Sequence, residues 1–130
     1  MHVEIRDAVE ADAERLAELT ESPTDVMRNL VHDRTVRVAA DDDDAIQGFV
    51  SFDARRETVH VTQLEGPVDV CERLLEEPLR FARGEGMAVE LLVAESDDDR
   101  RAAAEAADFV TDGPGPRFDG TRTVRYRRSP

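Results

Sequence analysis

The stretch VTQLEGPVDVCERLL, residues 61–75, changes its hydrophobic pattern at a Gly-Pro pair. Before the pair, apolar residues alternate as they do along a β-strand; after it, Cys71, Leu74 and Leu75 recur with helical spacing. A strand that passes through a glycine turn into a helix is also an arrangement that binds phosphate, because N–H groups at a helix N-terminus attract an anion. The fold and the candidate site therefore both depend on these residues.

Similar patterns predict the other elements of the chain. Strands are predicted at residues 3–6, 35–40, 45–52, 58–64, 87–95 and 121–128, and helices at residues 9–19, 25–33, 68–83 and 96–109. A loop is predicted at residues 113–120. Alternation along residues 58–64 assigns Val59, Val61 and Gln63 to one face and His60, Thr62 and Leu64 to the other.

Pro78 lies inside the third predicted helix. Proline has no N–H group to donate, and its ring crowds the carbonyl of the residue four positions earlier, here Leu74. We therefore expect this helix to kink or break near Glu77.

The charge of the chain is strongly one-sided. The sequence has 30 acidic and 17 basic residues, for a net charge of −13, and every basic residue is arginine. This composition resembles that of extremely halophilic archaea, whose cytoplasm is salty. Nucleic acids and anionic membranes are not expected as partners, because both attract proteins mainly through an excess of lysine and arginine.

The remaining bulk properties predict one folded domain over residues 1–130. Hydrophobic residues make up 40% of the chain, and 130 residues suit a single core. Cys71 is the single cysteine, so no internal disulfide is expected. Neither a signal-peptide pattern nor a membrane-spanning hydrophobic run is present, so we expect a cytoplasmic location.

The predicted order is strand, two helices, three strands, helix, strand, helix and strand. This order resembles the Gcn5-related N-acetyltransferase (GNAT) superfamily. The likeness is carried by IRDAVEADAERLAEL (5–19), IQGFVSF (46–52), FARGEGMAVELLV (81–93) and AADFVTDGPGPRFDGTRTVRYR (106–127). It implies an α/β (α+β) acyl-CoA N-acyltransferase-like fold, with a mixed, mostly antiparallel central sheet of about six strands and helices on both faces.

The resemblance also implies a binding site for acetyl-CoA where the fourth and fifth strands separate. By this likeness, the pantetheine arm is expected at Val61, Thr62, Gln63 and Leu64, and the pyrophosphate at Gly66, Val68, Asp69 and Val70. Asp97 stands where the family often has an asparagine.

The phosphate loop departs from the family signature, which is glutamine or arginine, two residues, glycine, one residue, then glycine or alanine. Residues 63–68 match the first two anchors, Gln63 and Gly66, and have Val68 at the third. An alignment on the helix instead, over residues 66–71, loses both glycine positions. Pro67 removes an N–H donor, and Glu65 and Asp69 add negative charge.

Three residues are candidates for proton transfer. His60 and Glu65 are candidate bases beside the expected site of the acyl group. Where the family often has a tyrosine that protonates the leaving thiolate, this sequence has Ala104, which leaves Tyr126, the single tyrosine, as the candidate acid.

Structural interpretations stand beside these functional ones. His60 can be a partly buried strand residue, and Cys71 a core residue rather than a nucleophile. The arginine-rich segment 122–128 can attract the phosphates of CoA, or guard an edge strand against pairing with other chains. No metal is expected, because the three histidines lack ligand spacing and residues 41–46 lack the glycine of a calcium loop.

The sequence thus predicts an N-acetyltransferase that moves an acetyl group from acetyl-CoA to an amine by direct attack. The acceptor is a small molecule or a protein, and a homodimer is a further candidate assembly. The alternative is a non-catalytic module of the same fold that senses a CoA ester or binds a protein partner. The missing second glycine and the absent tyrosine favour this alternative.

The charge composition predicts salt-dependent stability. At about 1 M salt the Debye length falls to roughly 3 Å, so distant carboxylates no longer repel one another. We expect urea to unfold the protein more easily as KCl is lowered from about 1 M to about 0.1 M, with circular dichroism as the readout. Equal midpoints at the two salt concentrations would contradict the halophilic interpretation.

Overall fold

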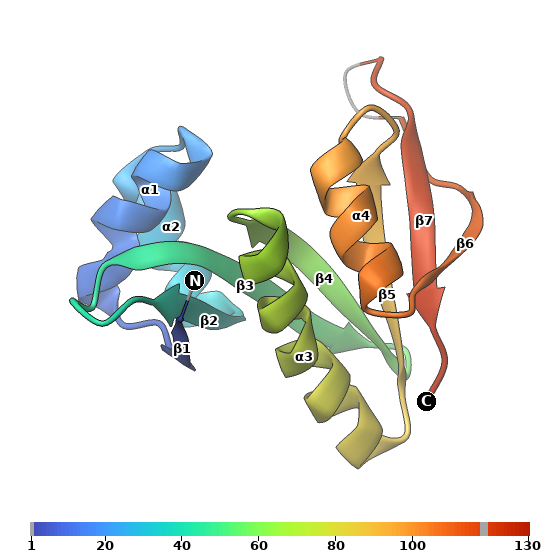
Figure 1. The fold of residues 1–130 in the computed structure, drawn as a ribbon, viewed down its shortest axis with the longest axis horizontal. Helices are drawn as coiled ribbons and strands as arrows, with labels where there is room; N and C mark the ends of the chain where they lie inside the picture. Colours follow the sequence, from blue (N-terminus) through green and yellow to red (C-terminus); the bar gives the residue numbers. More distant parts are fainter. Residues whose placement is uncertain (1, 118–119) are drawn as a thin grey trace.

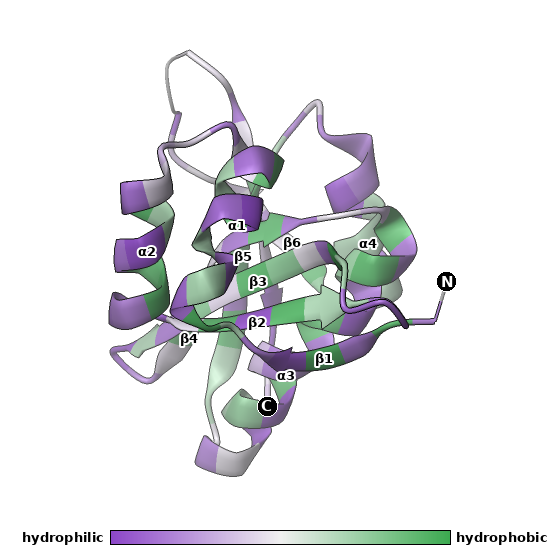
Figure 2. Cartoon of the chain, turned by 90° about the vertical axis from the view of Figure 1, so that its left-hand side faces the viewer, coloured by the Kyte–Doolittle hydropathy of each residue, from purple (hydrophilic) through white to green (hydrophobic). Residues whose placement is uncertain are grey.

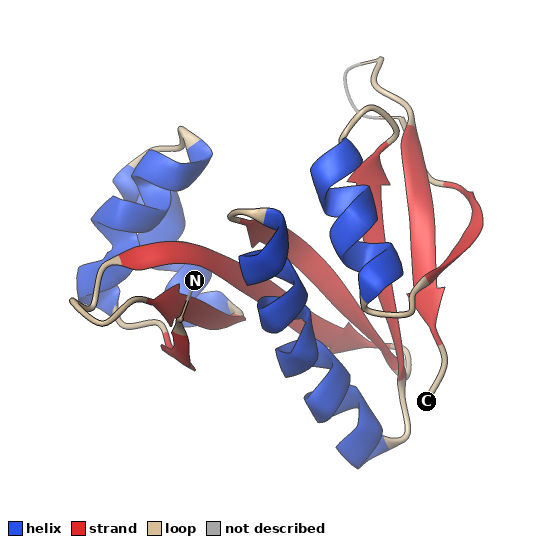
Figure 3. Cartoon of the chain, in the orientation of Figure 1, coloured by secondary structure: helices blue, strands red, loops and turns tan. Residues whose placement is uncertain are grey.

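A mixed β-sheet runs through the protein, with helices against both of its faces (Figures 1 and 3). The structure is a computed structural model, and it describes residues 2–117 and 120–130. The strands are β1 (Glu4–Asp7), β2 (Thr35–Ala40), β3 (Ile46–Arg55), β4 (Thr58–Glu65), β5 (Ala88–Ala94), β6 (Val110–Pro114) and β7 (Thr123–Arg128). The helices are α1 (Ala13–Thr20), α2 (Thr24–Asp33), α3 (Val68–Glu85) and α4 (Asp98–Ala106), and a 3-10 turn, η1 (Glu10–Asp12), precedes α1.

The strands lie in the order β1-β2-β3-β4-β5-β7-β6. Neighbouring strands are antiparallel except for β4 and β5, which are parallel. This arrangement confirms the predicted fold class. The part of the chain that the structure describes forms seven strands rather than about six, because β6 pairs with β7.

β6 was missed because its sequence carries no strand pattern. All five residues, VTDGP, are exposed, so no apolar alternation marks them. The strand takes the first two residues of the loop predicted at 113–120, and residues 118–119 of that loop lie outside the described residues.

A kink or a break was predicted near Glu77, and the helix does not break there, because α3 continues from Val68 to Glu85. Proline inside a helix costs about 3 kcal/mol. Burial of a leucine contributes about 1.5–3 kcal/mol, and Leu74, Leu75 and Leu79 are all buried on the same helix. Packing therefore outweighs the local penalty, and the helix ends instead at Gly86, which has the left-handed conformation that favours glycine.

Two hydrophobic cores lie on opposite faces of the sheet. The larger one packs α3 and α4 against strand residues such as Val59, Val61 and Leu91. The smaller one packs α1 and α2 through Leu16 and Met27 against β2 and β3. Figure 2 shows the consequence for α2, which turns its apolar side toward the sheet and its hydrophilic side outward.

A β-bulge in β4 changes the predicted alternation. Ser51 pairs with Gln63 and Phe52 with Val61, so Thr62 is an extra residue in the ladder. Beyond the bulge Leu64 joins the same core as Val61, and its assignment to the opposite face is wrong. The bulge therefore determines which side chains at the end of β4 face the hydrophobic core and which face away from it.

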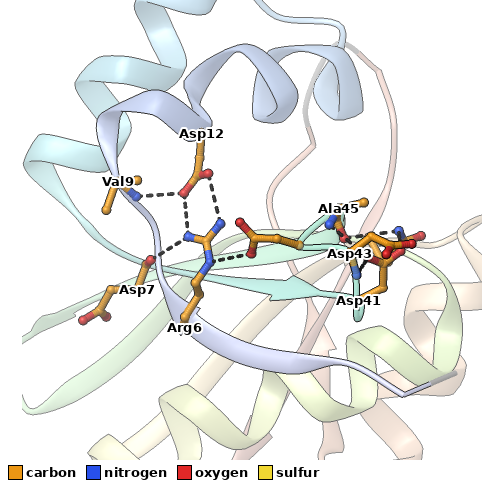
Figure 4. A network of polar contacts seen from close by, with 9 residues as sticks. Arg6, Asp7, Val9, Asp12, Asp41, Asp43 and Ala45 are labelled. Carbon is orange, nitrogen blue, oxygen red and sulfur yellow. Dashed lines mark hydrogen bonds and ion pairs between the residues drawn. The ribbon is translucent and has the colours of Figure 1, made fainter.

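An ion pair fixes the connection between β1 and the first helices (Figure 4). Arg6 donates two hydrogen bonds to the carboxylate of Asp12, at 2.8 and 3.2 Å, and the backbone N–H of Val9 donates to the same carboxylate at 2.9 Å. Arg6 also reaches Asp44 in the β2–β3 hairpin at 3.3 Å. The hydrogen bonds from Arg6 lower the pKa of Asp12, against the opposing effect of burial.

We predict that Asp12→Asn lowers the free energy of unfolding by about 1–2 kcal/mol near neutral pH, since a charge-assisted pair is lost. The pKa of Asp12 is lowered from its ordinary value of 3.8. Its contribution is therefore complete above that value and is lost as pH falls through the lowered pKa. Urea unfolding at about pH 7 and about pH 3 should show the difference shrinking in acid. Asp25→Asn, at an exposed pair with Arg28, is the control and should change little.

Candidate functional site

The parallel strands β4 and β5 separate toward their C-terminal ends (Figure 1). Their pairing runs from Thr58 and Ala88 to Val61 and Leu91 and then stops, while β4 continues to Glu65 and β5 to Ala94. Main-chain groups on the facing edges have no strand partner beyond that point. A cleft of about 250 Å³ opens there, lined by Val61, Thr62, Gln63, Leu64, Glu65, Leu91, Leu92, Val93, Ala94, Asp97 and Arg100.

A larger groove of about 530 Å³ lies elsewhere, between β1 and α3. Two of its lining side chains, Arg80 and Glu77, pair with each other at 2.9 Å. The smaller cleft is the better candidate, because open strand edges form it and its lining reaches Glu65, the last residue of β4 before the turn into α3.

The turn from β4 into α3 packs tightly against β3. A Cβ atom on Gly48 would overlap the carbonyl oxygen of Glu65, and Gly66 has φ +133°, a conformation that only glycine adopts easily. The two glycines therefore let the end of β4 and the start of α3 approach β3 closely. Gly66 has a structural role whether or not the turn binds phosphate.

The N-terminal end of α3 points out of this turn. The first helical hydrogen bond joins the N–H of Cys71 to the carbonyl of Pro67 at 2.9 Å. The N–H groups of residues 68–70 therefore lie at the positive end of the helix dipole. The side chain of Val68 packs on the core, Val70 is buried, and Asp69 is exposed.

Arg100 occupies the cleft and pairs with Glu65. Its Nε donates to the carbonyl oxygen of Leu64 at 2.6 Å, and its guanidinium forms an ion pair with the Glu65 carboxylate. Asp97 caps α4 by accepting from the backbone N–H of Arg100 at 3.2 Å. Burial raises the pKa of Glu65, and the charge of Arg100 opposes that shift.

His60 lies beside the cleft rather than in its lining. It stands in the paired part of β4, between Asp53 on β3 and Glu90 on β5, and it is half-buried. Glu90 is in turn paired with Arg125 at 3.1 Å and Arg127 at 3.3 Å. His60 precedes Val61, the last residue before the strands separate.

Tyr126 is buried under α4, outside the residues that line the cleft. Its hydroxyl accepts a hydrogen bond from Arg101 at 3.0 Å and donates one to Glu105 at 3.1 Å. Cys71 is also buried, and its thiol donates to the carbonyl of Gly66 at 3.3 Å. Burial raises the pKa of Cys71 to about 11, so the thiol stays protonated near neutral pH.

The structure thus separates the sequence-predicted residues into three groups. Val61, Thr62, Gln63, Leu64, Glu65 and Asp97 line the cleft; Gly66, Val68, Asp69 and Val70 form the turn and the start of α3; and His60 and Tyr126 lie outside the lining. Arg100 was missed, as were residues 91–94 of β5. The available signal for Arg100 was its position three residues after Asp97, which places both on one side of a helix.

No metal cluster and no spanning helix occur within residues 2–117 and 120–130. Groups of three or more histidine, cysteine, aspartate or glutamate side chains able to hold a metal ion are absent from this part of the chain. None of its helices is both long enough and apolar enough to cross a membrane.

The fold is shared with known acetyltransferases. No protein-family model matches the sequence, and a search of curated proteins gives no match. Among solved structures, a GNAT superfamily phosphinothricin acetyltransferase from Sinorhizobium meliloti in complex with acetyl-CoA is 19% identical, with TM-score 0.79 over 99% of this chain and 89% of that one. Arabidopsis thaliana NAA60 with a bisubstrate analogue is 14% identical, with TM-score 0.80 over 98% of both chains. An N-acetyltransferase from Staphylococcus aureus Mu50 is 13% identical, with TM-score 0.82 over 99% of both. The chain therefore has the fold of the GNAT acetyltransferases.

The contact between Gly48 and the end of β4 predicts opposite effects for two glycine substitutions. Gly48→Ala should lower the free energy of unfolding by about 1–3 kcal/mol, because the methyl group would overlap the carbonyl of Glu65. Gly84→Ala has open space around the new methyl group and lies in α3, so it should raise stability by about 0.5–1 kcal/mol. Urea unfolding measures both. A Gly48→Ala variant as stable as the wild type would disprove the tight contact.

Proposed function

We propose that this protein is an N-acetyltransferase that transfers an acetyl group from acetyl-CoA to an amine. The observation that carries the proposal is the cleft between the separated ends of β4 and β5, beside the N-terminus of α3. The shared fold supports it, since the Sinorhizobium meliloti enzyme of this fold was solved in complex with acetyl-CoA.

The residues of the cleft fit an extended ligand that carries amide groups and ends in phosphate. The edge of β4 beyond Val61 offers main-chain donors and acceptors to such a chain, as an open strand edge does to a peptide. The pyrophosphate would lie at residues 66–70, where the helix N-terminus favours negative charge. Gln63 also lines the cleft, and it stands at the first position of the phosphate-loop signature.

The direction of such a ligand favours His60 over Glu65 as the base. Glu65 directly precedes the turn, so it would lie at the phosphate end. The acyl end of the ligand would lie toward Val61, where the strands meet, and His60 is the next residue along β4. In this proposal His60 accepts the proton of the attacking amine, directly or through a water molecule.

Acetyl-CoA supplies a thioester, whose carbonyl carbon forms a bond to the amine nitrogen while its bond to sulfur breaks and the thiolate leaves. Transfer is direct rather than through an acyl-cysteine, because Cys71 is buried, protonated and hydrogen-bonded to Gly66. No tyrosine is in the lining of the cleft within the described residues, so we assign protonation of the thiolate to solvent.

The alternative function is a non-catalytic module that binds a CoA ester or a protein partner. The position of Tyr126 favours it, since its hydroxyl is held between Arg101 and Glu105 under α4. The two functions differ in turnover: an enzyme releases free thiol from acetyl-CoA when amines are supplied, and a sensing module does not. A panel of small amines and peptide N-termini, with a thiol reagent as the readout, separates them.

Calorimetric titration of acetyl-CoA in about 1 M KCl tests the proposed site. We expect binding at millimolar ligand or below. Asp69→Arg should tighten it about threefold to tenfold, because a guanidinium replaces a carboxylate beside the pyrophosphate. Glu85→Arg, at the other end of α3, makes the same change of charge and should bind like the wild type.

Two results would count against the proposal. Absence of binding at millimolar acetyl-CoA would exclude the enzyme function. Equal affinities for Asp69→Arg and Glu85→Arg would show that the phosphates do not lie at the start of α3.

A further inference from the structure

Arg100 joins the two walls of the cleft. Its backbone belongs to α4, which follows β5, and its guanidinium reaches across to β4. There Nε donates to the carbonyl oxygen of Leu64 at 2.6 Å, and the guanidinium pairs with Glu65. Its Nη1 also lies 3.4 Å from Asp97 on its own wall. The side chain is 25% exposed, so it lies within the cleft instead of extending into solvent.

The hydrogen bond from Arg100 occupies the carbonyl oxygen of Leu64, a main-chain acceptor that an incoming ligand would use. The ladder with β5 ends at Val61, so β5 supplies no partner for the carbonyl of Leu64. A ligand with amide groups would bind the open edge of β4 through such main-chain groups. Arg100 already occupies this one with a charge-assisted hydrogen bond, which is stronger than a bond between neutral groups.

The charge balance of this cluster also opposes an entering phosphate. Two carboxylates, Glu65 and Asp97, face the one guanidinium of Arg100, so the three side chains together carry a net negative charge. A phosphate group gains little from Arg100 while the guanidinium stays paired with Glu65. The cluster therefore holds the two walls of the cleft together and attracts no anion while these contacts last.

We propose that Arg100 is an internal latch, which closes the cleft and must release Leu64 and Glu65 before an acyl-CoA binds. The latch rests on the function proposed above, and it adds a residue that sets affinity for the acyl donor. While the latch is closed the site does not bind, so the apparent dissociation constant is the intrinsic constant divided by the open fraction. Removing the latch should therefore increase affinity, the opposite of removing a residue that holds the ligand.

Calorimetric titration of acetyl-CoA into the full chain, in about 1 M KCl, tests the latch. Arg100→Ala, made together with Glu65→Gln so that the variant leaves no unpaired Glu65 carboxylate in the cleft, should bind acetyl-CoA about tenfold more tightly than the wild type. Arg100→Lys should also bind more tightly, because lysine keeps the charge but lacks the planar fork that bridges Leu64 and Glu65. Arg73→Ala removes an exposed arginine from α3, outside the cleft lining, and should match the wild type.

The outcomes separate the latch from the proposed function. Weaker binding by the double variant would show that Arg100 holds the ligand, and equal binding would show that it closes nothing. Either result overturns the latch and leaves the acetyl-CoA site in place. Absence of binding by the wild type and both Arg100 variants at millimolar ligand would overturn the proposed function and the latch together. Arg100→Lys keeps the test decisive if the double variant does not fold.

Discussion

The separation of β4 from β5 is the constraint on which the rest of the site depends. β4 follows β3 to its end, because the bulge at Thr62 and the close approach of Gly48 and Gly66 hold it there. β5 remains paired with β7 from Val89 to Ala94. β4 thus stays with β3 while β5 stays with β7, and the parallel ladder between β4 and β5 ends at Val61. The open strand edges, the exposed start of α3 and the space that Arg100 enters all follow from this separation.

Opening a sheet leaves main-chain groups that need partners, and this protein supplies one from its own side chains. Arg100 satisfies the carbonyl of Leu64 and neutralises Glu65, so an edge that would otherwise depend on water is stabilised within the chain. The same use of arginine recurs at Arg6, which joins β1 to Asp12 and Asp44. In a chain with a net charge of −13, these arginines position carboxylates that would otherwise repel one another.

Local sequence patterns predicted the helices and strands in which buried apolar residues recur at a regular spacing. The strand predicted at 35–40 is β2 itself. Prediction failed where tertiary contacts override the period. Pro78 stays inside α3 because three buried leucines stabilise the helix. Leu64 faces the core because of the bulge in β4. All residues of β6 are exposed, so no apolar pattern marks it as a strand. In the site, the residues before and after Gly66 were expected from the resemblance to the GNAT superfamily, whereas Arg100 was not.

The sequence by itself determined the order of the elements other than β6 and the position of the strand-turn-helix at residues 61–75, because periodicity and turn residues act over a few neighbouring positions. Only the tertiary structure decided which groups share the cleft. Arg100 lies 36 positions from Leu64 and 35 from Glu65, yet it contacts both. Such a contact depends on strand order, on register and on the angle at which two strands separate. These are properties of the assembled sheet, and no local pattern of apolar residues encodes them.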